Sequence, residues 1–79
     1  MQAEDFHKQL MELEGWMVNL TSYRINGRYL AEVEAISSGV TIARATHEAR
    51  AVAEQDAIGA AIKRLSRTRR MDLDLTVGG

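Results

Sequence analysis

The sequence contains no cysteine and no proline among its 79 residues. Without cysteine there is neither a disulfide framework nor a thiolate metal site, so the usual supports of small secreted domains are missing. The histidines are only two, His7 and His47, and their positions do not have the spacing of metal ligands. We therefore predict no metal and no cofactor, and we expect the protein to be cytoplasmic.

Aromatic side chains, long apolar runs and excess charge are also scarce. One Trp, two Tyr and one Phe leave few surfaces on which nucleic-acid bases could stack. No apolar run approaches the ~18 residues that a membrane span requires, and Glu4 and Asp5 lie where an export signal would be basic. The net charge of -1 excludes a uniformly basic nucleic-acid binder. We expect neither membrane insertion nor export.

The motifs of enzymes are missing as well. The chain has no phosphate-binding loop and no Gly-x-Ser-x-Gly sequence. Glu32 and Glu34 share one face of an expected strand, and that face is expected to meet water, which would not raise a carboxyl pKa for acid catalysis. We predict that the protein is not an enzyme and has no catalytic residues.

The chain length is typical of a single domain over residues 1–79, whose core must be thin. Phe6, Leu10 and Leu13 are spaced by four and three residues, which predicts a first helix over residues 1–14. Alternating apolar and polar residues then predict a three-stranded antiparallel meander over residues 16–45. Asn26-Gly27 is the type I′ turn that joins its first two strands.

A second helix is predicted over residues 46–67, with Thr46 as its N-cap. Alanines recur at every fourth position along it, and Gly59 in its interior predicts close approach of another backbone. The segment 68–79 completes a basic stretch and continues into alternating residues 71–77, which predict a fourth strand. The expected fold class is α+β, in the order α-β-β-β-α(-β), with helices packed on the meander.

Half of the basic residues gather between Lys63 and Arg70. Cations near a helix C-terminus complement the helix dipole, but they can also contact phosphates or an acidic protein surface, and the sequence leaves these alternatives open. The candidate partner- or phosphate-binding residues are Arg50, Lys63, Arg64, Arg67, Arg69 and Arg70.

The predicted layout resembles a double-stranded-RNA-binding domain over about residues 3–66. Its best local match is Ala49–Ile58, which is similar to the family's Ala-Lys-x-x-Ala-Ala-x-x-Ala-Leu helix. The family places adjacent lysines at the helix start to hold phosphates, whereas this chain has Thr46, His47 and Glu48 there and only Arg50 fits. The resemblance therefore implies the fold and argues against strong binding of duplex RNA.

The chain also resembles the N-terminal domain of HicB-like antitoxins in Tyr29–Val33, Gly39, Thr46 and Glu48-Ala49, without the family's DNA-binding extension. That resemblance implies a small protein that neutralises a nuclease by covering it. In size the chain is similar to anti-CRISPR and other phage inhibitors of bacterial defence.

Together these features predict a non-enzymatic regulator or inhibitor that docks on a protein or nucleoprotein complex. The alternative is a nucleic-acid-binding module of double-stranded-RNA-binding shape. We also expect a homodimer that forms through the C-terminal strand or the second helix.

Overall fold

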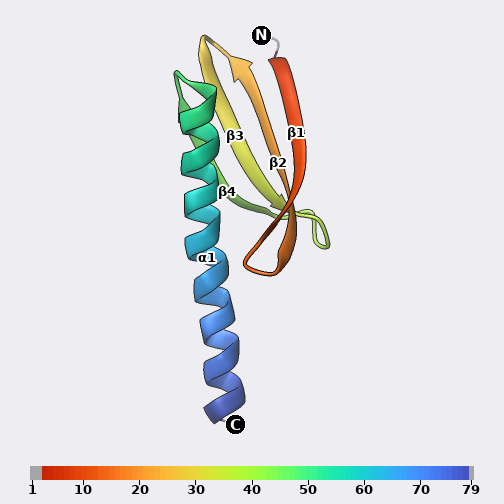
Figure 1. Cartoon of the computed structure of the whole chain (residues 1–79), viewed down its shortest axis with the longest axis vertical. Helices are drawn as coiled ribbons and strands as arrows, with labels where there is room; N and C mark the ends of the chain where they lie inside the picture. Colours follow the sequence, from red (N-terminus) through yellow and green to blue (C-terminus); the bar gives the residue numbers. More distant parts are fainter. Residues whose placement is uncertain (1–2, 79) are drawn as a thin grey trace.

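The computed structural model describes residues 3–78, and it describes side chains as far as residue 67. Four strands precede one helix: β1 (Glu4–Leu13), β2 (Trp16–Ile25), β3 (Arg28–Ala35), β4 (Thr41–His47) and α1 (Arg50–Gly78). The strands form one antiparallel sheet in chain order, and α1 covers one face of it (Figure 1). We call this covered side the helix face and the opposite side the open face.

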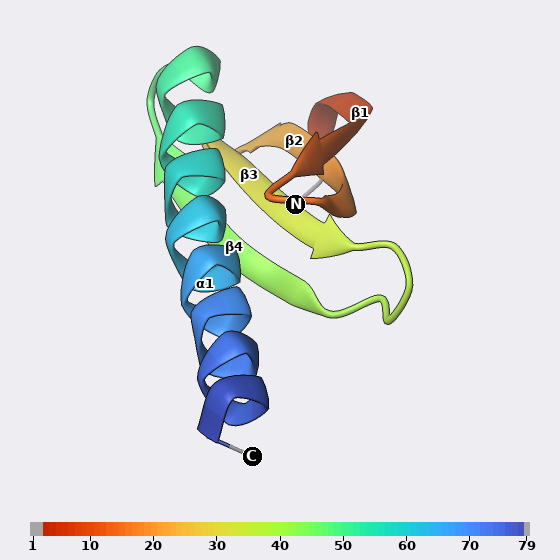
Figure 2. The same ribbon diagram turned by 60° about the horizontal axis from the view of Figure 1, so that its bottom comes forward.

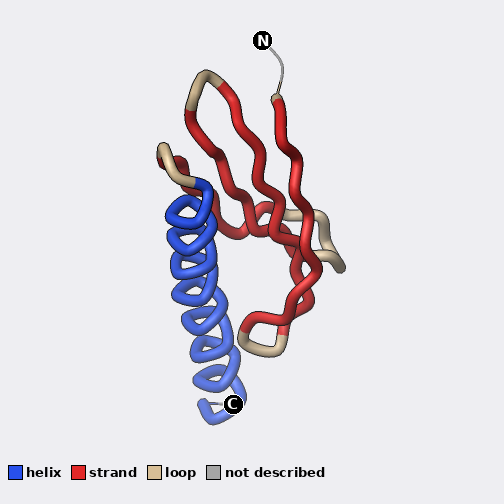
Figure 3. The backbone as a smooth tube through the Cα atoms, turned by 45° about the horizontal axis from the view of Figure 1, so that its top comes forward, coloured by secondary structure: helices blue, strands red, loops and turns tan. Residues whose placement is uncertain are grey.

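Two-residue turns join the first three strands, and Figure 3 shows how short these connections are. Asn26 and Gly27 have φ of 55° and 73°, which confirms the predicted hairpin between β2 and β3. Glu14 and Gly15 have φ of 51° and 83° and join β1 to β2 in the same way. Gly15, the first residue after the predicted helix over residues 1–14, is therefore the second position of a hairpin turn.

The predicted helix over residues 1–14 is wrong, because these residues form β1. Phe6 and Leu10 project from the open face, whereas Met11 and Leu13 project from the helix face and pack partly against the core. The spacing of Phe6, Leu10 and Leu13 is compatible with either period when a strand has apolar residues on both faces. Pairing with β2 satisfies the backbone groups of β1 that point towards β2, and it overrides the helical preference of the Glu, Lys, Gln and Leu residues of β1.

The start of the long helix also differs from the prediction. Thr46 is not an N-cap but a residue of β4, where it pairs with Leu30. The helix begins at Arg50, and the backbone N–H of Ala49 donates to Nδ1 of His47 at 2.9 Å. The side chain of His47 therefore satisfies one of the backbone donors near the helix start.

The predicted C-terminal strand is wrong too, because α1 continues through residues 71–77. An alternating pattern yields a strand only where a neighbouring strand accepts its backbone hydrogen bonds. Proline is absent from the chain, and glycine is absent between Gly59 and Gly78, so nothing in the sequence interrupts the helix. The observed order is β-β-β-β-α, and the predicted α-β-β-β-α(-β) topology does not hold.

The core lies between α1 and strands β2, β3 and β4, and small side chains dominate it. Figure 2 shows α1 lying along β4 and β3, with β1 farthest from the helix. The buried core cluster consists of Val18, Leu20, Ala31, Val33, Ala43, Ala53, Ala57 and Ala61. Alanines on both sides of this contact allow the helix and the sheet to approach closely. The alanine stripe therefore packs on the chain's own sheet.

Gly59 lies on the outer side of α1. A Cβ atom built at this position would meet nothing within 4 Å, so the predicted close approach of another backbone is absent from the described chain. At 1.5 Å per residue, the 29 residues of α1 extend about 43 Å, and the helix continues past the end of the sheet (Figure 1).

On these two sides of α1, a larger side chain should change the free energy of unfolding in opposite directions. Ala57→Leu should lower the free energy of unfolding by about 1–3 kcal/mol, because the site is fully buried against the sheet. Gly59→Ala should raise it by about 0.5–1 kcal/mol, because the new methyl group meets open space and restricts the unfolded chain. Urea unfolding of both variants measures the difference, and equal effects would contradict the packing described above.

Candidate functional site

The open face of the sheet is not covered by α1, since the described helix lies on the other side (Figure 2). Cross-strand pairing places side chains on it in rows, such as Lys8–Thr21–Glu32–Arg44 and Leu10–Asn19–Glu34–Thr41. The next row towards the β1–β2 turn contains Glu12, Met17 and Ile36, in which the N–H of Ile36 donates to the carbonyl of Met17 at 3.2 Å. The row at the other end contains Phe6, Tyr23, Leu30 and Thr46.

Large apolar side chains are exposed on this face. The exposed fractions are 63% for Phe6, 59% for Leu10, 47% for Met17 and 46% for Ile36. Single exposed apolar residues are ordinary, but apolar side chains grouped on one face and mixed with polar residues are typical of interaction surfaces. The open face is therefore a candidate docking surface.

An aromatic pair and a carboxylate organise one half of the open face. The rings of Phe6 and Tyr23 stack with centroids 4.9 Å apart. The Tyr23 hydroxyl donates to Oε1 of Glu32 at 3.4 Å, and Nη2 of Arg44 donates to Oε2 of the same carboxylate at 3.1 Å. Phe6, Tyr23 and Glu32 also line a shallow depression of about 290 Å³, which Lys8, Thr21 and Glu34 complete.

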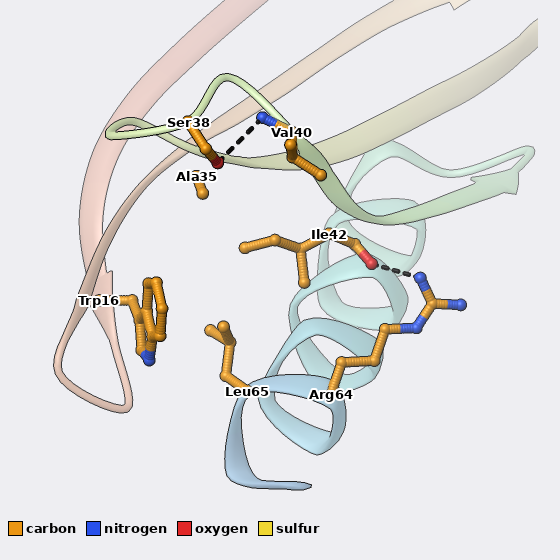
Figure 4. A pocket seen from close by; sticks show the side chains of 7 residues that line it. All are labelled: Trp16, Ala35, Ser38, Val40, Ile42, Arg64 and Leu65. Carbon is orange, nitrogen blue, oxygen red and sulfur yellow. Dashed lines mark hydrogen bonds between the residues drawn. The ribbon is translucent and has the colours of Figure 1, made fainter. Parts of the chain in front are cut away.

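A second, apolar pocket lies where the sheet ends beside α1 (Figure 4). It has a volume of about 250 Å³ and is lined by Trp16, Ala35, Ser38, Val40, Ile42, Arg64 and Leu65. The indole of Trp16 faces Leu65, while the guanidinium of Arg64 points away from the pocket and donates to the carbonyl of Ile42. The lining therefore suits an apolar group and offers no arrangement for catalysis.

The other end of the helix face is polar. Ser22 is fully buried, and its hydroxyl donates to Oε2 of Glu54 at 2.6 Å. Nη2 of Arg50 donates to the carbonyl of Asp5 at 2.6 Å, and its guanidinium lies 4.7 Å from the centre of the Tyr29 ring. The buried Nε of Arg50 has no hydrogen-bond partner within the described chain. Arg50 therefore ties α1 to β1 and β3.

Arg24 on β2 joins the same end of the molecule to β1. Its Nη2 lies 3.0 Å from Oε1 of Glu4, and its Nε lies 3.9 Å from Oδ2 of Asp5. The hydrogen bond to Glu4, followed by the charges of Glu4 and Asp5, raises the pKa of Arg24. These exposed pairs fix the position of β1 more than they stabilise the fold, because solvent screens them.

The predicted binding residues do not form one patch. Arg50 lies at the start of α1, roughly 20 Å along the helix from Lys63 at ~1.5 Å per residue, and it is engaged with Asp5 and Tyr29. Arg64 donates a hydrogen bond to the carbonyl of Ile42. Lys63 and Arg67 are exposed on α1. Arg69 and Arg70 belong to α1, and their side chains lie outside the described ones.

Phe6 is the important residue that the sequence prediction misplaced, because it was assigned to the apolar stripe of a helix. Tyr23 lies on the face of β2 opposite to Trp16 and stacks on Phe6. The sequence pattern that could have placed Phe6 correctly is the series Phe6, Lys8, Leu10 and Glu12. These residues are spaced by two, so in a strand they share one side, on which apolar and charged residues alternate.

Among the described residues, no three His, Cys, Asp or Glu side chains converge as metal ligands would. No described helix has the length and hydrophobicity of a membrane span. No protein-family model, curated protein or solved structure matches the chain.

The packing of Arg50 predicts a structural role for this residue. Arg50→Ala should lower the free energy of unfolding by about 1–2 kcal/mol, because it removes the contacts to Asp5 and Tyr29. Lys63→Ala, at an exposed position of the same helix, should change it by less than about 0.5 kcal/mol. Thermal and urea unfolding of both variants measure this contrast. An Arg50 variant as stable as the parent would return the residue to the candidates for phosphate contact.

Proposed function

We propose that this chain is a non-enzymatic binding protein that regulates or inhibits a protein or nucleoprotein complex by docking through the open face of its sheet. The observation that carries the proposal is the group of exposed apolar side chains on the side of the sheet that α1 leaves uncovered. We place its action in the cytoplasm, as expected for a chain without cysteine.

The chemistry of the open face favours a protein surface over nucleic acid as the direct contact. Glu12, Glu32 and Glu34 project from it, and Arg44 is already paired with Glu32. Unpaired carboxylates repel phosphates, whereas apolar side chains between polar ones are typical of protein interfaces. A partner patch with apolar residues and a basic residue would complement this face.

The nucleic-acid alternative rests on Lys63 and Arg67, which are exposed on the helix and not on the open face. It no longer draws support from the predicted topology, because β1 replaces the leading helix. Binding through phosphates should weaken steeply with salt, since counterions are released on binding.

A capture experiment with matched variants tests the proposal. Met17→Lys combined with Ile36→Glu replaces two exposed apolar residues by an opposite-charge pair in neighbouring positions and leaves the core unchanged. The purified parent should capture a partner from host lysate after nuclease treatment and at moderate salt. The double variant should lose this capture by at least roughly tenfold, because exposed apolar anchors dominate such contacts.

The control is Lys63→Ala combined with Arg67→Ala, which changes the exposed cations and should keep the capture. If the open-face variant binds as well as the parent, the proposed docking surface is wrong. Capture that disappears with nuclease, with salt or with the Lys63 and Arg67 changes would establish the nucleic-acid alternative.

A further inference from the structure

The sheet has two edges, and the fold protects only one of them. At the β4 edge the pairing with β3 shifts between Val33 and Glu34, so that Ile42 is an extra residue on β4. The guanidinium of Arg64 donates a hydrogen bond to the carbonyl of Ile42, so this acceptor is already used. A bulge and a charged side chain are two ways in which proteins prevent an edge strand from accepting another strand.

The β1 edge has no bulge over most of its length, and the charged side chains on the open face of that part, Lys8 and Glu12, have opposite signs. Its only irregularity lies between Glu4 and His7, and from His7 to Leu13 the pairing with β2 is regular. β1 is an edge strand of the sheet, and it is the strand that has the least contact with α1 (Figure 1). Backbone groups along this edge are therefore available to another strand.

The side chains of β1 are complementary to a second copy of the same strand. Lys8 and Glu12 lie two residues on either side of Leu10, and all three project from the open face. If two β1 strands pair antiparallel with Leu10 opposite Leu10, each Lys8 lies opposite a Glu12 of the other copy. Opposite charges at such cross-strand positions stabilise pairing, and the leucines between them cover each other.

Neighbouring registers lose this complementarity. With Gln9 at the centre, Lys8 would lie opposite Leu10. With Met11 at the centre, Leu10 would lie opposite Glu12, and Lys8 would need Glu14, whose carboxylate already accepts a hydrogen bond from Ser66 at 2.8 Å. A register shifted by one residue would place the open face of one copy beside the helix face of the other, and polar side chains would then lie against apolar ones.

We propose that two copies of this chain form a dimer through β1, paired antiparallel about Leu10 into one continuous sheet. The same surface is used by both copies, so the contact closes on itself and does not propagate. Both α1 helices then cover one side of the joined sheet, and the two open faces combine on the other. The sequence predicts a homodimer through the C-terminal strand or the second helix. The segment predicted to form that strand is helical, and the dimer proposed here forms through the first strand instead.

Charge reversal tests the register. The parent should show the mass of a dimer, twice 8.8 kDa, in sedimentation equilibrium. Lys8→Glu alone and Glu12→Lys alone should each weaken dimerisation by roughly 10- to 100-fold, because both cross-strand pairs become repulsive. An equimolar mixture of the two variants should dimerise again, because every pair in the mixed dimer is attractive. A variant that failed to fold would not dimerise again on mixing, so the mixture distinguishes lost pairing from lost folding.

Cross-linking tests the contact directly, because the chain contains no cysteine. Leu10→Cys should form an intermolecular disulfide on mild oxidation, since paired strands bring the two Cα atoms within the range that a disulfide requires. Ile36→Cys, an exposed position on the same face but away from β1, should not. Lys63→Glu is the matched charge control and should keep the dimer mass.

A parent that is monomeric at all concentrations would overturn the proposal, as would a mixture of the two charge variants that stays monomeric. Preferential cross-linking through Ile36→Cys would overturn it too. The proposed docking function is tested separately, because Met17 and Ile36 belong to the β2 and β3 part of the open face, so a monomer could still capture a partner.

Discussion

The close contact between α1 and one face of the sheet is the constraint on which the rest of the structure depends. Ala53, Ala57 and Ala61 lie against a surface that includes Ala31 and Ala43, and Val18, Leu20 and Val33 are the larger side chains of this buried cluster. A core of this kind buries little apolar area per residue, so every element that can be covered by the single helix is covered. One helix covers one face of the sheet and leaves the other face open, and β1 is the strand that the helix contacts least.

The open face shows how a small domain can combine order with exposed apolar surface. Phe6 and Tyr23 cover part of each other, and Glu32 receives both the Tyr23 hydroxyl and Arg44, so the polar groups of this half are already organised. Met17 and Ile36 lie at the other end of this face and are also exposed. A surface arranged in this way needs little side-chain ordering on binding, which lowers the entropic cost of association.

The two proposals concern neighbouring parts of one surface. Pairing of β1 strands would place the open faces of two copies side by side, and a larger continuous face can bury the area that stable protein interfaces require, about 800 Å² per partner. The difference between the β1 and β4 edges is the physical basis for pairing through β1. At the outer edge of β4, Arg64 and the bulge at Ile42 oppose pairing with another strand. In β1 the pairing with β2 is regular around Leu10, and Lys8 and Glu12 are placed symmetrically about this residue. Arg64, a candidate for phosphate contact in the sequence, thus has an identifiable role within the fold.

The sequence by itself determined the local features whose physics is contained in a few neighbouring residues. These are the Asn26-Gly27 turn, the alternation in β2 and β3 and the alanine stripe of α1. Tertiary structure alone decided that residues 4–13 form a strand and that residues 71–77 continue a helix, because their apolar spacing fits both periods and a strand exists only where a neighbour pairs with it. It also decided the site: Phe6 meets Tyr23, and Arg50 meets Tyr29, only when strands distant in sequence are brought together.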